Sequence, residues 1–183
     1  MPRLVLINGA PGSGKSTLAR RYAQDHPLTL ALDIDRVRGM LGRWLDTPTE
    51  AGQLARHMAI EMARVHLCAG HNVIVPQFLG RLDFVEALQR LCDEVKAEFV
   101  EVVLLSSPEE AAARFVRRTD QSTSAEHRDA ATLLERSGGP DALPGIYRRL
   151  LAVVAARPGT RIVVTVDGQV DQAYADLLTR LST

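Results

Sequence analysis

The segment Gly9 to Ser16 constrains the structure of this chain more than any other part of the sequence. It reads Gly-Ala-Pro-Gly-Ser-Gly-Lys-Ser and fits G-x-x-x-x-G-K-S, the pattern of a phosphate-binding loop. The apolar run 3–8 before it is typical of a strand, and residues 15–25 after it have the spacing of a helix. A strand, a glycine loop and a helix in this order predict a binding site for a nucleoside triphosphate.

Each residue type in the loop has a physical reason. Glycines let the backbone N–H groups approach phosphates without a Cβ in the way, and the helix N-terminus favours an anion. Lys15 can reach the β- and γ-phosphates, and the Ser16 hydroxyl is the expected protein ligand of Mg²⁺. The residues that we expect to bind ATP are Gly9, Ala10, Pro11, Gly12, Ser13, Gly14, Lys15, Ser16 and Thr17.

Composition narrows the class of protein. A length of 183 residues with 46% hydrophobic residues predicts one domain, 1–183, with a sizeable core. The formal net charge is zero, which disfavours a dedicated nucleic-acid binder. No apolar stretch approaches the length of a membrane span or resembles a signal peptide, so we expect a cytoplasmic protein without a membrane partner. Cys68 and Cys92 are expected to be buried free thiols and not a disulfide.

Strand-like runs alternate with helical patterns along the chain, which predicts an α/β fold with a parallel sheet. The carboxyl ends of such strands form the ligand-binding edge. The strands are expected at residues 3–8, 28–33, 72–76, 99–105 and 161–166, and the helices at residues 15–25, 35–45, 49–69, 81–96, 108–119, 143–157 and 170–181.

The segment 120–142 interrupts this alternation. It is polar, marked by glycines and too long for a tight connection. We interpret it as a lid that excludes water from the site, with a plain surface loop as the alternative.

A second cluster of polar residues follows the second predicted strand. Asp33 ends that strand, Asp35 begins the next helix, and Arg38 lies on the same helix face as Asp35. A kinase that acts on a hydroxyl needs a carboxylate to orient the attacking oxygen and accept its proton, and Asp35 is our candidate. Arg38 can hold the acceptor, and Asp33 can face the acceptor or Mg²⁺. The alternative is that Asp35 only caps the helix.

The loop Gly9–Thr17 and the D-x-x-R of Asp35 and Arg38 together resemble small P-loop kinases. These are the bacteriophage-type polynucleotide 5′-kinase group and its relatives, which include chloramphenicol phosphotransferase, zeta toxins, and gluconate and shikimate kinases. The resemblance implies a three-layer P-loop NTPase fold with a five-stranded parallel sheet in the order 2-3-1-4-5. It also implies that Asp35 is the general base, that Arg38 contacts the acceptor, and that arginines of the lid stabilise the transferring phosphoryl group.

Several further residues are candidates on this basis. Arg114, Arg117 and Arg118 end the helix that leads into the lid. They resemble the lid arginines, with Arg118 as the catalytic candidate and Arg114 on the nucleotide; the alternative is a cationic helix C-terminus. Arg128 is a further lid candidate. The third strand ends at Pro76 without the acidic residue of a Walker B motif, and Gln77 and Arg81 beside it are possible substrate contacts.

Three residues on the segments between the second and third strands lie where this fold covers the acceptor. They are Trp44, Arg56 and His57. For Trp44, a core position competes with a stacking platform.

Three functions follow from the sequence. The leading one is an ATP-dependent phosphotransferase that acts on a hydroxyl or phosphate of a small molecule. A polynucleotide 5′-hydroxyl kinase is the second, favoured by motif spacing and disfavoured by the neutral charge. A nucleotide-switched binding module or GTPase is the third, and the sequence has neither N-K-x-D nor D-x-x-G to support it.

Overall fold

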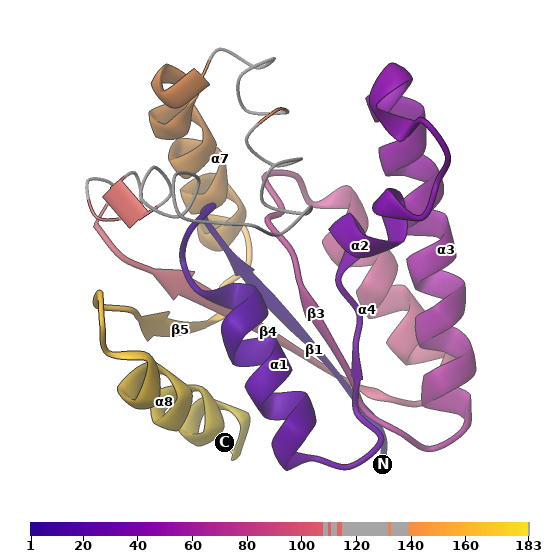
Figure 1. Ribbon diagram of the computed structural model, residues 1–183. Coiled ribbons are helices and arrows are strands. Elements are labelled where there is room, and N and C mark those ends of the chain that lie inside the picture. The colour runs from indigo at the N-terminus through magenta and orange to yellow at the C-terminus, as the bar shows by residue number, and fades with distance from the viewer. Residues whose placement is uncertain (108–109, 111–112, 115–131, 133–138, 183) are drawn as a thin grey trace.

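Strand β1 is the centre of the sheet. The computed structural model describes residues 1–107, 110, 113–114, 132 and 139–182. In it β1 (Arg3–Gly9) pairs in parallel with β3 (Val73–Pro76) on one side and β4 (Glu98–Leu105) on the other. The outer strands are β2 (Leu30–Ala31), beside β3, and β5 (Arg161–Val164), beside β4. The order is therefore 2-3-1-4-5, which confirms the expected P-loop NTPase topology (Figure 1).

Helices cover both faces of this sheet because side chains alternate along each strand. Leu4 and Leu6 of β1 point into one core, and Val5 and Ile7 point into the other. Helices α2, α3, α4 and α7 cover the first face, and α1 and α8 cover the second, which gives three layers (Figure 1). The helices are α1 (Lys15–Asp25), α2 (Ile34–Gly39), α3 (Pro48–Cys68), α4 (Asp83–Val95), α7 (Leu143–Ala155) and α8 (Val170–Ser182), with short 3-10 helices η1 (Trp44–Asp46) and η2 (Gly139–Ala142).

The structure shortens two predicted elements. The strand expected at 28–33 is only β2, because Leu28 has a left-handed backbone with φ 61° and Asp33 already caps the following helix. The helix expected at 35–45 ends at Gly39 and is followed by η1, with Arg43 also left-handed at φ 52°.

Among the described residues, one charged side chain is buried in the sheet core. Glu101 in β4 is 5% exposed and forms an ion pair with Arg157, which follows α7. Arg157 also donates to the side-chain oxygen of Gln89 in α4 at 2.9 Å. This contact ties α4, α7 and β4 together, and periodicity along the sequence gives no sign of it.

The two cysteines differ in exposure. Both are free thiols, as expected, and Cys92 is buried, but the expectation that Cys68 is buried is wrong. The buried stripe of α3 repeats every four residues and ends at Leu67, so the next position turns away from the core. Within the described residues, no helix is both long and apolar enough to cross a bilayer.

This difference predicts selective alkylation of Cys68. The thiolate is the reactive form, and burial raises the pKa of Cys92 to about 12, so its thiolate is scarce at neutral pH. A maleimide should label only Cys68 in the folded protein and both cysteines after unfolding. Cys68→Ser should abolish labelling of the folded protein as measured by intact mass. Rapid labelling of Cys92 in that variant would contradict the packing described above.

Candidate active site

The glycine loop joins β1 to α1 and leaves the helix N-terminus open. Ser13 donates its backbone N–H to the carbonyl of Ala10 at 3.1 Å, and Gly14 takes φ 93° immediately before Lys15 begins α1. Gly14 offers no side-chain cap, and the first turn of α1 holds no acidic residue. The N–H groups of that turn can therefore donate hydrogen bonds to an anion, and the helix dipole favours its binding there.

Gly9 is required by close approach of the backbone. A Cβ at this position would lie 2.6 Å from Ser13 Oγ and 2.9 Å from the backbone oxygen of Leu104 in β4. The second contact is with rigid backbone, so any larger residue must displace the loop from the sheet. The first glycine of the motif thus fixes how tightly the loop sits on β4.

Lys15 and Ser16 lie at the start of α1 with defined partners. Lys15 Nζ donates to the carbonyl oxygen of Ala10 at 2.9 Å, which folds its side chain back over the loop. Ser16 Oγ donates to Asp33 Oδ2 at 3.4 Å, a long hydrogen bond that joins the loop to the segment after β2. Hydroxyl and carboxylate oxygens are ligands suited to Mg²⁺, so this pair fits that ion.

Asp33, and not Asp35, caps α2. Its Oδ1 accepts from the backbone N–H of Asp35 at 3.0 Å while its Oδ2 faces Ser16. Burial raises the pKa of Asp33, the nearby charge of Asp35 raises it further, and the hydrogen bonds oppose both effects. Because the capping function falls on Asp33, the carboxylate of Asp35 is left for other contacts.

The carboxylate of Asp35 pairs with Arg38 one helical turn later. Arg38 Nη2 lies 3.0 Å from Asp35 Oδ1, which confirms that the two share a helix face. The guanidinium of Arg38 is 4.4 Å above the ring of Trp44, and Trp44 is only 8% exposed. Trp44 is thus a buried support for Arg38 in this structure, and the stacked contact holds the guanidinium in place.

Asn8, the last residue of the apolar run 3–8, was not among the candidate residues, and the structure places it at the base of the glycine loop. It is fully buried at the end of β1. Its Oδ1 accepts from the backbone N–H groups of Gly9 at 2.8 Å and Leu79 at 2.9 Å, and its Nδ2 donates to the Leu79 carbonyl at 3.1 Å. These bonds hold the start of the glycine loop against the segment after β3. The sequence does mark Asn8, because it is a polar residue between an apolar strand and the first glycine of the loop.

The segment after β3 brings Gln77 and Arg81 to the same edge of the sheet. Gln77 donates its backbone N–H to Ile7 at 3.0 Å, while its side-chain Oε1 is buried without a hydrogen-bond partner among the described residues. Arg81 is exposed just before α4. Burial lowers the pKa of Arg56 on α3, and the charges of Arg38 and Arg81 lower it further, against the opposing charge of Asp35. His57, next to Arg56, is exposed.

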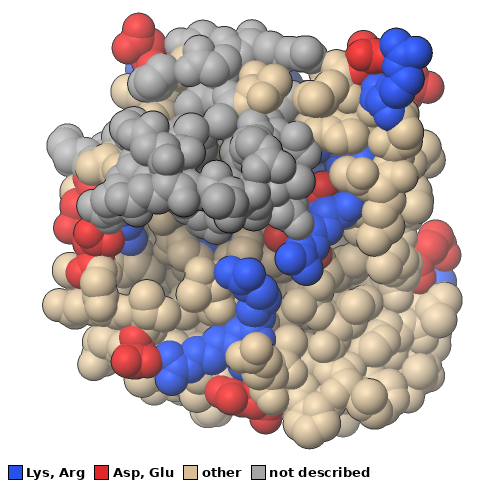
Figure 2. Space-filling model, in the orientation of Figure 1, with Lys and Arg blue, Asp and Glu red and all other residues tan. Residues whose placement is uncertain are grey.

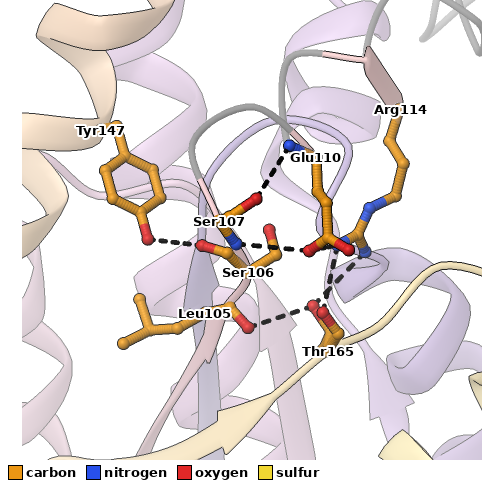
Figure 3. A network of polar contacts seen from close by, with 7 residues as sticks. All are labelled: Leu105, Ser106, Ser107, Glu110, Arg114, Tyr147 and Thr165. Carbon is orange, nitrogen blue, oxygen red and sulfur yellow. Dashed lines mark hydrogen bonds and ion pairs between the residues drawn. The ribbon is translucent and has the colours of Figure 1, made fainter.

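Arg114 lies at the other end of the site, beyond β4 and β5 (Figure 3). Its guanidinium donates to the Thr165 carbonyl at 3.1 Å and lies 3.6 Å from the Glu110 carboxylate. Its Nε is buried and makes no hydrogen bond to the described residues. Tyr147 of α7 donates to the Ser106 carbonyl at 2.6 Å in the same network. Arg117, Arg118, Arg128 and most of the segment 120–142 lie outside the described residues.

A comparison with profiles of protein families finds a match over most of the chain. A profile of the family described as an AAA domain matches residues 4–137, well over half of the sequence. No curated protein sequence gives a significant match.

Solved structures share the whole fold at low sequence identity. A Chloroflexus aurantiacus j-10-fl protein, named provisionally as a kinase, has a TM-score of 0.69 at 19% identity, over 99% of this chain and 95% of that one. A gluconokinase from Sinorhizobium meliloti 1021 has a TM-score of 0.63 at 16% identity, over 99% and 92% of the two chains. The Mycobacterium tuberculosis APS kinase CysC, in complex with AMPPNP and APS, has a TM-score of 0.60 at 15% identity, over 100% and 98%. At these identities the likeness is one of fold.

The Asn8 contacts predict a coupled loss of stability and nucleotide binding. Asn8→Ala leaves the N–H groups of Gly9 and Leu79 buried and unpaired, at about 1–3 kcal/mol each. We expect urea unfolding to show a loss of about 2–6 kcal/mol, together with weaker binding of an ATP analogue by calorimetry.

Asn72→Ala is the matched control. Asn72 Oδ1 accepts from the Arg3 N–H at 2.9 Å at the opposite end of the sheet. That variant should lose stability but keep its nucleotide affinity. Equal nucleotide affinities for Asn8→Ala, Asn72→Ala and the unmodified protein would show that the Asn8 contacts do not position the loop.

Proposed function

The chain belongs to the AAA domain family, and from this and the geometry above we propose that it is a kinase that transfers the γ-phosphoryl group of ATP to a small-molecule acceptor. The observation that carries the proposal is the contact of Ser16 with Asp33, 3.4 Å apart. Asp35 and Arg38 follow Asp33 on the same segment, so this contact supports a position for the pair near the phosphate loop. A carboxylate and an arginine at that position are what a transfer reaction needs and what nucleotide binding alone does not.

The nucleotide side of the site is the loop from Gly9 to Thr17. In this proposal its N–H groups hold the phosphates, and Lys15 leaves the Ala10 carbonyl to contact the β- and γ-phosphates. Arg114, bound to the Thr165 carbonyl after β5, would border the nucleotide, and its Nε makes no hydrogen bond to the described residues. Arg118 remains our candidate for stabilising the charge that develops on the γ-phosphoryl group.

Ser16 and Asp33 are the residues that would hold Mg²⁺. When bound, the ion would neutralise part of the negative charge of the phosphates. Burial raises the pKa of Asp33 because it disfavours the charged carboxylate. A cation beside Asp33 would stabilise that charged form.

Asp35 and Arg38 act on the acceptor. Asp35, 38% exposed, orients the acceptor hydroxyl and takes its proton as the hydroxyl oxygen bonds to the γ-phosphorus. The bond from that phosphorus to the bridging oxygen of ADP breaks, and the products are ADP and the phosphorylated acceptor. Arg38, held by Trp44 and Asp35, keeps the acceptor in line.

The surface favours a small acceptor over a polynucleotide. On the face in Figure 2, the basic side chains form one narrow diagonal row, with acidic side chains beside its lower end, and the coloured residues form no broad basic surface. The chain as a whole has no net charge. Polynucleotide binding draws most of its affinity from a continuous positive surface. Phosphorylation of a 5′-hydroxyl oligonucleotide in preference to every small acceptor would reverse this choice.

Two substitutions separate nucleotide binding from transfer. Lys15→Ala removes a charge that acts on the phosphates, so turnover should fall at least about a hundredfold. Asp35→Asn keeps the shape but removes the base, so we expect ATP-analogue binding to stay within about twofold while transfer falls about a hundredfold or more. Transfer is measured with γ-labelled ATP and an acceptor panel, and binding by calorimetry.

Asp46→Asn is the control for Asp35→Asn. Asp46 of η1 forms the same kind of pair, with Arg43 three residues earlier at 2.7 Å, and both of these side chains are exposed. It should leave transfer unchanged. Full transfer by Asp35→Asn would disprove the assigned mechanism.

A further inference from the structure

Helix α3 has an apolar side that faces away from the core. The helix packs against α2, α4 and β3, and its opposite side lies at the right-hand edge of the molecule (Figure 1). The buried side is a row of alanines that ends at Leu67. A surface helix ordinarily carries polar and charged side chains on the side away from the core. The exposed side of α3 departs from this pattern.

Four apolar side chains lie along that exposed side. Leu54 is 47% exposed, Met62 is 38% exposed and Val65 is 71% exposed. Met58 lies between them and is half-buried. At about 100° per residue the four side chains fall within about 80° of the helix circumference, so they form one row, which we call the α3 stripe. Single exposed apolar residues are common, whereas a row over about three turns of one helix is typical of an interaction surface.

The α3 stripe is symmetric along the helix. Leu54 and Val65 lie at equal distances from a midpoint at residues 59–60, and Met58 shares this midpoint with Met62 to within half a residue. A contact between two identical chains related by a two-fold axis requires such symmetry, because residue i contacts residue j of the copy while residue j contacts residue i. Two antiparallel copies of α3 would bring Leu54 against Val65 of the second copy. Met58 would meet Met62 in the same way.

The charged residues beside the stripe are complementary under the same symmetry. His57 and Glu61 are both exposed, lie on one flank of the stripe, and have the same midpoint to within half a residue. In an antiparallel pair, each Glu61 carboxylate would lie beside the His57 imidazole of the other copy and could accept a hydrogen bond from it. Arg64, three residues after Glu61, is paired with Glu94 of α4 at 2.8 Å. It therefore brings no unpaired charge to this flank.

The size of the surface predicts a weak dimer. The stripe extends from Leu54 to Val65, about 17 Å along the helix. Stable interfaces bury about 1,200–2,000 Å² in total, and a contact limited to one helix of each copy lies at or below the lower end of this range. We therefore expect monomers and dimers to exchange at micromolar concentrations of the protein.

We propose that the α3 stripe is the contact surface of a homodimer in which the α3 helices of two copies pack antiparallel. A second copy is the occupant because a two-fold contact accounts both for the symmetry of the stripe and for the placement of His57 and Glu61. An unrelated partner would require neither. The proposal does not depend on the kinase function, since the stripe includes no residue of the glycine loop or of the segment after β2.

Sedimentation velocity over a range of concentrations tests the proposal. The unmodified protein should change from monomer to dimer between about 1 and 200 μM. Leu54→Lys and Val65→Glu each place a charge against an apolar side chain of the second copy, so each should raise the Kd of the dimer about tenfold or more. Both side chains are exposed in the single chain, so the variants should keep the circular-dichroism spectrum of the unmodified protein.

The double variant tests the antiparallel arrangement. Positions 54 and 65 are about 17 Å apart on one helix, so the introduced lysine and glutamate cannot pair within one chain. In the antiparallel dimer each introduced lysine would meet the introduced glutamate of the other copy. The double variant should therefore dimerise more tightly than either single variant, whereas independent losses would multiply to about a hundredfold.

Two controls complete the experiment. Leu151→Lys changes a leucine of similar exposure, 42%, on α7 and should leave the Kd unchanged. The two Cys68 residues of an antiparallel dimer would lie about 25 Å apart, so mild oxidation should not link the copies, whereas a parallel pair would bring the thiols together.

Three results would overturn the proposal. The first is a protein that stays monomeric at every concentration, which would leave the stripe to a different kind of partner. The second is a dimer that tolerates Leu54→Lys and Val65→Glu as well as it tolerates Leu151→Lys. The third is a dimer that the double variant does not restore, or that oxidation links rapidly through Cys68, because either outcome excludes antiparallel packing.

Discussion

The end of strand β1 is the constraint on which the rest of the site depends. β1 is the central strand, hydrogen-bonded on both sides and buried, so its last residues cannot move without the sheet. Gly9 packs so closely on the Leu104 backbone that a Cβ would lie 2.9 Å from its oxygen. Asn8 binds the backbone of Leu79, 71 residues away in the sequence. The phosphate loop therefore starts from a rigid point that also fixes the segment after β3.

The site beyond the end of β1 has two halves that differ in their charged groups. The loop and the start of α1 offer N–H groups and Lys15 to phosphates. The other half, after β2, combines carboxylates with arginines, and Asp33 connects the two through Ser16. Asp33 is used in capping α2, which leaves Asp35 for the reacting hydroxyl in the proposed mechanism. In the proposed mechanism Asp33 serves the metal and Asp35 the acceptor, and both lie on this one short segment.

Much of this could be predicted from the sequence, and the exceptions have a common physical origin. The loop is readable because its backbone demands particular residues at fixed positions, and the sheet order followed from resemblance and is confirmed. The Asp35–Arg38 pair is local and was expected. The Asn8–Leu79 bonds and the Glu101–Arg157 ion pair join segments far apart in the chain, so no local pattern indicates them.

The most direct test of the central claim is a crystal structure with Mg²⁺ and a non-hydrolysable ATP analogue. The account predicts that the phosphates lie over the N-terminus of α1 and that Lys15 Nζ leaves the Ala10 carbonyl, now 2.9 Å away, for a γ-phosphate oxygen. Asp35 should then face the γ-phosphate across a space large enough for an acceptor hydroxyl. A triphosphate bound away from the loop, or Lys15 still on Ala10 with nucleotide present, would contradict it.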